Sequence, residues 1–471
     1  MSIRPPQNQA ISRSLAEFVV NLDLMAVPPE VKRRAKHLLL DSLGVALASS
    51  SFEFGRAAAR GLLRLETGLT PVIGLPDRLT LRDAAMVNGI LVHGLDYDDT
   101  SIYGRIHPSS FCATTAFTLS GHRHLSGAEM LTAYIAGLEC SIRIGAVAKG
   151  GFQRRGFHPT GIVASFGSAL VASRLMKLTH DQTAMSQGIA YATASGNQEF
   201  AATMAWTKRM HPGWGAAGGI TSAALASEGF TGPLTPYEGK FGLYQLYLGG
   251  DDWDYAIATK ALGQQWLVEG ISMKPLPACY FNVPLIDAMM RIASEHRPAP
   301  KDIEEIQVLV PEAAINTVCE PQGKKRRPSD SYAAQFSAFY ATAVTLGRSR
   351  FSLDDLTPEA LADPEILAIA DKVTYIVDPK TTFPQHYSGA VVVRMRDGRI
   401  FEAREDVDRG SPKRPLVEAD VIEKFKDNAG RSLVQKNADK IIDIVMNVEK
   451  LADAHELALL LSAAERVAER K

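Results

Sequence analysis

Hydrophobic residues recur at helical spacing through the first half of the chain, from residue 12 to about residue 268. The segment PPEVKRRAKHLLLDSLGVALASS (28–50) begins with prolines that suit a first helical turn, and its apolar residues follow at intervals of three and four. Ser126-Gly-Ala-Glu129 and Thr179-His-Asp-Gln182 are capping-box patterns that open two further helical stretches. This half of the chain therefore predicts helices packed on helices, and its pattern indicates no strand.

The pattern changes after residue 270. IEEIQVLVP (303–311) alternates between apolar and polar residues, KVTYIVDP (372–379) is rich in β-formers, and 390–407 carries Asp-Gly between two alternating arms. The last of these is a strong β-hairpin signal. Helical stretches at 329–347 and 357–370 lie between the strands. These features predict a separate α+β domain over residues 270–408.

The remainder of the chain, from residue 409 to residue 471, is helical again. We expect it to pack on the first domain. The predicted fold is therefore mainly α, with a large all-helical domain built from 1–269 and 409–471 and a smaller α+β domain at 270–408. A length of 471 residues agrees with two domains, since a single core rarely grows that large.

Charge and cysteine usage exclude several classes of partner. The net charge of −1 gives no overall field that would attract nucleic acid or an anionic membrane, so binding of an anion must depend on locally placed Lys, Arg and His. No CxxC pair occurs among the four cysteines, which argues against a disulfide framework or a thiolate zinc site and suits a reducing compartment. The N-terminus has no apolar signal segment, and no apolar run approaches about 20 residues. We expect a cytoplasmic protein with neither nucleic acid nor membrane as a partner.

Polar chemistry is concentrated in four short stretches, each beside glycine or proline. The densest is HGLDYDDTSIYGRIHPSS (93–110); the others are GFHPTG (156–161), TKRMHPGWGAAGG (207–219) and MKPLPAC (273–279). Polar side chains on rigid turns at helix ends are typical of catalytic groups. Each stretch taken alone is also typical of ordinary structure, because a single histidine is more often a hydrogen-bonded core residue than a catalyst.

Standard cofactor sites do not fit these stretches. Asp96, Asp98, Asp99 and His107 offer oxygen and imidazole ligands, but there is no HExxH pair, EF-hand loop or cysteine pair, so no metal is expected. Asp98 and Asp99 are expected only to cap a helix end and to meet solvent. The glycines of 213–219 have neither Walker spacing nor the dinucleotide-binding pattern, and no G-x-S-x-G elbow occurs. Metal-free acid–base catalysis on an anionic small molecule remains, with histidines exchanging protons and lysines and arginines holding carboxylates.

These motifs, in this order, resemble the MmgE/PrpD family over nearly the whole chain. The resemblance rests on LDYDDT, the following HPSS, GFHPTG, TKRMHPGWGAAGG, KPLPAC and QFSAFYATAVTLG. The family includes 2-methylcitrate dehydratases, cis-aconitate decarboxylases and an iminodisuccinate epimerase. The resemblance implies a helical domain built from both chain ends, a smaller α+β lid, a homodimer, and no metal or organic cofactor.

The site residues are carried over motif by motif. The predicted catalytic residues are His107, His158, Lys208 and Asp96, and the predicted substrate-binding residues are Thr100, Lys274, Arg105 and Arg209. The resemblance implies all of these residues except Arg105 and Arg209. Arg105 lies in a loop that differs from that of the decarboxylases and could bind an extra carboxylate. Arg209 is included because it lies beside Lys208 in the sequence.

Two departures from the family leave the substrate open: Leu276 stands where the family usually has tyrosine, and the loop between Thr100 and His107 carries Arg105. The basic run Lys324–Arg327 is expected to be solvated rather than part of an anion-binding lid. The leading hypothesis is a lyase that dehydrates or decarboxylates 2-methylcitrate, citrate, cis-aconitate or a similar acid. An epimerase of a dicarboxylate such as iminodisuccinate is the first alternative, and a non-catalytic dimeric binding or scaffold protein is the second.

Overall fold

The computed structural model describes residues 10–203, 205–250 and 252–462, which fold into two compact units. Unit 1 takes in the chain up to Ser272 and again from Val417, and unit 2 is Met273–Leu416. The prediction of a mainly α protein is confirmed, because helices make up most of the described elements and the sheets are small.

Unit 1 is a stack of helices around an apolar core. In chain order the helices are α1 (Ile11–Asn21), α2 (Pro29–Ser50), α3 (Glu53–Leu63), α4 (Leu81–His93), α5 (Ser109–Arg123), α6 (Gly127–Val147), α7 (Gly151–Arg154), α8 (Pro159–Leu175), α9 (His180–Tyr191), α10 (Phe200–Thr203), α11 (Thr207–Ser227), α12 (Leu243–Leu248), α19 (Glu418–Ala429), α20 (Gln435–Met446) and α21 (Ala454–Ser462). Both predicted capping boxes are present, at the N-termini of α6 and α9.

Helix α6 is buried along nearly its whole length. Among the described helices it alone is long and apolar enough to cross a membrane by length and composition, and its apolar window is entirely buried within the fold. Its buried Glu139 and Arg143 form an ion pair of 3.0 Å. Glu139 accepts the backbone N–H groups of Leu267 and Val268, so this pair ties a distant loop to the core helix and satisfies buried polar groups.

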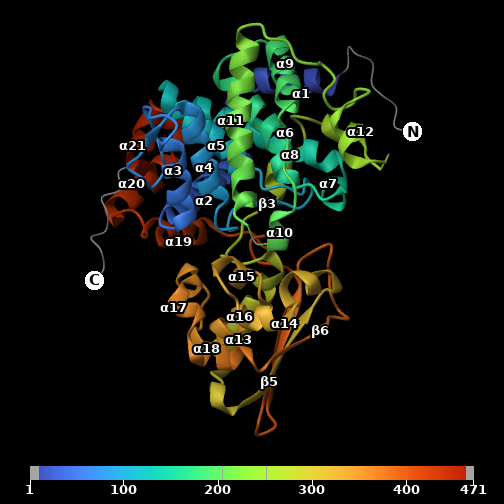
Figure 1. The fold of residues 1–471 in the computed structure, drawn as a ribbon, viewed down its shortest axis with the longest axis vertical. Helices are drawn as coiled ribbons and strands as arrows, with labels where there is room; N and C mark the ends of the chain where they lie inside the picture. Colours follow the sequence, from blue (N-terminus) through green and yellow to red (C-terminus); the bar gives the residue numbers. More distant parts are fainter. Residues whose placement is uncertain (1–9, 204, 251, 463–471) are drawn as a thin grey trace. The chain divides into compact units, whose positions relative to one another are not determined.

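The C-terminal helices pack on N-terminal ones, as Figure 1 shows for the red α19–α21 beside the blue α2–α5. The ammonium of Lys424 on α19 lies 2.6 Å from Oδ1 of Asp41 on α2, and both side chains are buried. The same ammonium donates to the carbonyl of Tyr97 at 3.0 Å and lies 3.8 Å from the centre of its ring. Helix α19 thereby holds the loop that carries the polar stretch.

Short strands occur in unit 1, where none was predicted. β1 (Thr70–Pro71) pairs with β2 (Arg78–Leu79), and β3 (Thr100–Ser101) pairs with β4 (Ile271–Ser272), both antiparallel. The prediction of no strand here is wrong, because two-residue strands are set by the approach of distant loops and leave no alternating pattern.

Unit 2 contains a four-stranded sheet in the order β6-β5-β7-β8. β5 (Ile303–Val310) pairs in parallel with β6 (Val373–Val377) and antiparallel with β7 (Gly389–Met395), which pairs in turn with β8 (Ile400–Glu405). The predicted hairpin is confirmed, with Gly398 at a φ of 89° in the turn. The helices are α13 (Val283–His296), α14 (Gln322–Arg326), α15 (Ser331–Gln335), α16 (Ala338–Arg348), α17 (Pro358–Leu361) and α18 (Pro364–Ala370).

The basic run is part of the fold of unit 2. Lys325 donates to the carbonyls of Thr317 and Phe336 at 2.6 and 2.8 Å, and burial lowers the pKa of its ammonium. Arg326 donates to the carbonyl of Ala370 at 2.8 Å. The expectation that this run is only solvated is therefore wrong for its two central residues.

Candidate active site

The polar stretch begins where α4 ends, at His93. The chain leaves the helix through a tight turn in which Asp96 has a φ of 50°, a left-handed conformation that aspartate tolerates better than most residues. The carboxylate of Asp96 is buried, and its Oδ1 lies 2.6 Å from Nζ of Lys208 in the first turn of α11. Two of the predicted catalytic residues thus form an ion pair between elements more than 100 residues apart in sequence.

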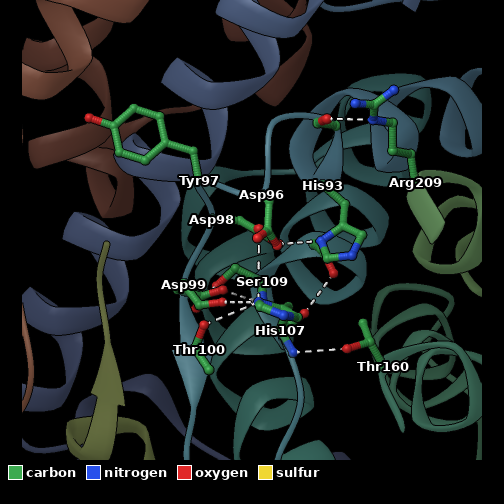
Figure 2. A network of polar contacts seen from close by, with 12 residues as sticks. His93, Asp96, Tyr97, Asp98, Asp99, Thr100, His107, Ser109, Thr160 and Arg209 are labelled. Carbon is green, nitrogen blue, oxygen red and sulfur yellow. Dashed lines mark hydrogen bonds and ion pairs between the residues drawn. The ribbon is translucent and has the colours of Figure 1, made fainter. Parts of the chain in front are cut away.

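His107 is fixed in one tautomer by its neighbours, shown in Figure 2. Its Nδ1 lies 2.8 Å from the carbonyl oxygen of Asp99 and 3.2 Å from Oγ1 of Thr100. A carbonyl can only accept, so the Nδ1 of His107 carries a proton. Oγ1 of Thr160, on α8, accepts the backbone N–H of His107 at 3.2 Å. In the neutral ring Nε2 is consequently the basic nitrogen.

His158 precedes α8 as its N-cap residue and is paired with a second histidine. Its Nδ1 lies 2.8 Å from Nδ1 of His211 on α11. Burial, followed by the charges that His93 and Lys208 can carry, lowers the pKa of His158 well below its usual range and that of His211 to about 4. Both rings are therefore neutral near pH 7. A neutral imidazole has a lone pair on one nitrogen and can accept a proton there.

His93 was not predicted as a site residue, and it forms a buried pair with Asp98. Both side chains have 0% exposure, and Nδ1 of His93 lies 2.7 Å from Oδ2 of Asp98. Nε2 of His93 is buried without a hydrogen-bond partner among the described residues. The ring of His93 lies 4.9 Å from that of His107 and 5.7 Å from that of His158, measured between centroids. His93, His107 and His158 thus form one group, called the histidine cluster below, with His93 between the other two.

The expectation that Asp98 and Asp99 meet solvent is wrong, since both are buried, whereas Asp99 does accept a backbone N–H at the start of α5. Asp99 accepts hydrogen bonds from Oγ and N of Ser109 at 2.6 and 3.2 Å, and burial raises the pKa of its carboxyl to about 8.

A signal for His93 was present in the sequence, since His93 lies three residues before Asp96 at the end of an apolar helix.

One group of side chains could hold a metal ion, since His93, Asp98 and His107 offer atoms within 4.8 Å of one another. The fit is poor. Ligands of one tetrahedral ion at about 2.0–2.1 Å stand about 3.3 Å apart, whereas Nδ1 of His93 and Oδ2 of Asp98 are 2.7 Å apart, a hydrogen-bond distance. Nδ1 of His107 also donates to a carbonyl. Metal binding through these two Nδ1 atoms would have to break both bonds.

Unit 1 brings five of the predicted residues into one cluster: Asp96, Thr100, His107, His158 and Lys208. Both predicted arginines make contacts outside this cluster. Nε of Arg209 donates to the carbonyl of Gly94 at 2.7 Å, and its guanidinium lies 4.2 Å above the ring of Phe54, beside an apolar cavity of about 310 Å³. Arg105 is exposed and lies 3.4 Å from the amide oxygen of Gln153. Lys274 belongs to unit 2, and its place in the site stays a prediction.

Comparison with known proteins gives two family matches and several relatives. The model of the MmgE/PrpD N-terminal domain matches residues 13–256, and that of the MmgE/PrpD C-terminal domain matches residues 276–450. A protein of Aspergillus oryzae named cis-aconitate decarboxylase-like protein oryM is 26% identical, over 96% of this chain and 97% of its own length. The cis-aconitate decarboxylase of Homo sapiens is 27% identical, over 96% of this chain and 95% of its own length. The 2-methylcitrate dehydratase of Salmonella typhimurium is 24% identical over 96% of both chains.

Proposed function

The chain belongs to the MmgE/PrpD family, and on that premise we propose that it is a lyase that removes carbon dioxide or water from a small di- or tricarboxylate. The names of its relatives support this class of reaction, and they supply cis-aconitate and 2-methylcitrate as the first acids to test. Citrate is a third. We further propose that the enzyme is a cytoplasmic homodimer that works without a metal or organic cofactor.

The observation that carries this proposal is the placement of neutral imidazoles beside a half-buried lysine. His158 is held neutral by its surroundings, while Lys208 is held next to Asp96. Breaking a C–H or C–C bond next to a carboxylate places negative charge on that carboxylate, and a nearby ammonium stabilises the charge as it develops. Lys208 would supply this stabilisation, and a histidine would transfer the proton.

The two lyase reactions use the same groups. In decarboxylation the C–C bond breaks, carbon dioxide leaves, and the electron pair left on carbon is protonated by His107 or His158. In dehydration one histidine takes the C–H proton, and the hydroxyl leaves as water with a proton from the other. Decarboxylation needs one proton donor and dehydration needs two proton-transfer groups, which the start of α8 and the loop before α5 provide.

Epimerisation of a dicarboxylate such as iminodisuccinate is the second candidate. It is favoured by the same pair of imidazoles, because one base can remove a proton from carbon while the other returns a proton to the opposite face. This reaction would exchange the C–H proton with solvent without loss of mass from the substrate.

The test is to incubate the purified protein in D₂O with cis-aconitate, citrate, 2-methylcitrate and iminodisuccinate, and to read the products by mass spectrometry. Loss of CO₂, with one deuterium from the solvent on the product carbon, or loss of water would support a lyase, and deuterium in otherwise unchanged substrate would support the epimerase. His158→Ala and Lys208→Ala should abolish turnover, whereas His180→Ala, on the exposed start of α9, should not. Binding of these acids without any turnover would indicate the non-catalytic alternative, and unchanged turnover in either active-site variant would contradict the assigned residues.

A further inference from the structure

The contact between His158 and His211 constrains both rings. An imidazole nitrogen either carries a hydrogen and donates, or carries a lone pair and accepts. The two Nδ1 atoms lie 2.8 Å apart, so one of them must donate to the other. In a neutral pair the two rings therefore hold opposite tautomers: where one carries its hydrogen on Nδ1, the other carries it on Nε2.

The fold holds these two rings in place. The backbone N–H of His158 donates to the carbonyl of Gly196 at 3.2 Å, and the ring of Phe200 lies edge-on to both imidazoles, at 5.7 and 6.0 Å between centroids. A Cβ at Gly161 would come within 3.1 Å of the Cβ of His211 and 2.7 Å of the carbonyl of Ser195. Glycine at this position permits the close approach of α11 to the first turn of α8, and with it the contact between the two rings.

Double protonation of the pair is disfavoured. A proton on each Nδ1 would set two donors against each other, and burial opposes charge on both rings. A positive charge on His93 or on Lys208 lowers the pKa of both histidines further. The protein thus keeps the pair neutral while leaving one nitrogen of each ring outside the shared bond.

We infer that His211 is a positioning residue for the reaction, which fixes the tautomer of His158 and so decides which nitrogen meets the substrate; this inference rests on the proposed function. Because Nδ1 of His158 is engaged by His211, Nε2 is the nitrogen available for proton transfer. To accept a proton there, His158 must carry its own hydrogen on Nδ1 and donate it to Nδ1 of His211. The C–H electron pair stays on the substrate carbon, the proton moves to Nε2, and the Nδ1–H bond to His211 stabilises the imidazolium that forms.

Three variants test this inference. In His211→Asn the side-chain amide oxygen can take the place of Nδ1 as acceptor, whereas in His211→Gln the amide extends to the position of Nε2, and in His211→Leu no acceptor remains. We expect His211→Asn to keep kcat within about tenfold of wild type, and His211→Gln and His211→Leu to lose about 10²-fold or more in kcat with KM little changed. Equal kcat in the Asn and Gln variants would overturn the inference, and this comparison of two polar side chains holds even where the Leu variant does not fold.

The tautomer can be read without any turnover, from the ¹⁵N chemical shifts of histidine side chains in selectively labelled protein. The signals of His158 are assigned by their loss in His158→Gln. We expect the Nδ1–H form in wild type and in His211→Asn, and a shift towards the Nε2–H form in His211→Leu and His211→Gln. An unchanged tautomer in all three variants would refute the inference. A tautomer change in a protein that turns over none of the acids would instead refute the proposed function, so the two failures are distinguishable.

Discussion

Nδ1 of His93 lies 2.7 Å from Oδ2 of Asp98, and neither side chain reaches solvent. The other carboxylate oxygen of Asp98 lies 3.9 Å from Nδ1 of His107. One buried carboxylate therefore serves two imidazoles: it orients the first through a hydrogen bond, and it can stabilise positive charge on the second. This arrangement makes Asp98 the electrostatic centre of the histidine cluster, although it would be an unremarkable acidic residue in the sequence.

Replacing Asp98 by Asn should lower kcat by about 10²-fold with little change in KM, which is the effect expected when a proton-transfer group loses its partner. The amide keeps the shape of the carboxylate but removes the charge that stabilises protonated His107. Steady-state kinetics with the acid identified by mass spectrometry measure this effect.

The matched control for this variant is Asp181→Asn, which changes the same atoms at an exposed ion pair with Arg13. A melting temperature close to wild type would show that Asp98→Asn is folded. A folded Asp98→Asn protein with wild-type kcat would remove Asp98 from the catalytic set.

Asp96 and Lys208 should behave as one unit in a double-mutant cycle. Lys208→Ala leaves a buried carboxylate without its ammonium, and Asp96→Ala leaves the ammonium without its anchor, so each single variant should lower kcat/KM by about 10²-fold or more. The double variant should lose much less than the product of the two, with a coupling energy of about 1–3 kcal/mol. Simple additivity of the two losses would mean that the pair does not act together on the substrate.

Most of the helical pattern could be predicted from the sequence because it depends on local signals. Proline at the start of α2, the capping boxes of α6 and α9, and the Asp-Gly turn between β7 and β8 each act within a few residues. The helical stretch predicted over 329–347 is present but divided into α15 and α16, because Ser337 caps the backbone N–H of Tyr340 and starts a new helix.

The candidate site could be predicted only in part. The order of the motifs predicted His107, His158 and Lys208. The polar character of Asp98 suggested that this residue is exposed. Asp98 is in fact buried, in the loop between α4 and α5. The contact of His158 with His211 joins residues 53 positions apart. Pairings of this kind depend on how helices cross, which no spacing along the chain encodes.

Lys325 and Lys324 offer a comparison within one basic run. Lys325→Ala should lower the free energy of unfolding by about 1–3 kcal/mol, because the carbonyls of Thr317 and Phe336 lose their donor. Lys324→Ala, at an exposed neighbouring position, should change it by no more than about 0.5 kcal/mol. Urea unfolding monitored by circular dichroism measures both, and a loss of substrate affinity in either variant without loss of stability would instead favour an anion-binding role.

The stability of the protein should fall as pH drops from about 6.5 to about 4, in part through His211. Its pKa is about 4 in the folded chain against an ordinary value of 6.5, so between these values the unfolded chain binds more protons than the folded one. The stabilisation is therefore fully present above about pH 6.5 and is lost as pH falls through 4, with a total of about 3 kcal/mol for this residue. In His211→Asn that titration is absent, so the free energy of unfolding should decrease less steeply over the same range.

Urea unfolding of wild type and His211→Asn at pH 7 and pH 4.5 measures this difference, with His180→Ala as the control for loss of an exposed histidine. Parallel decreases in wild type and His211→Asn would show that His211 is not held neutral by the fold.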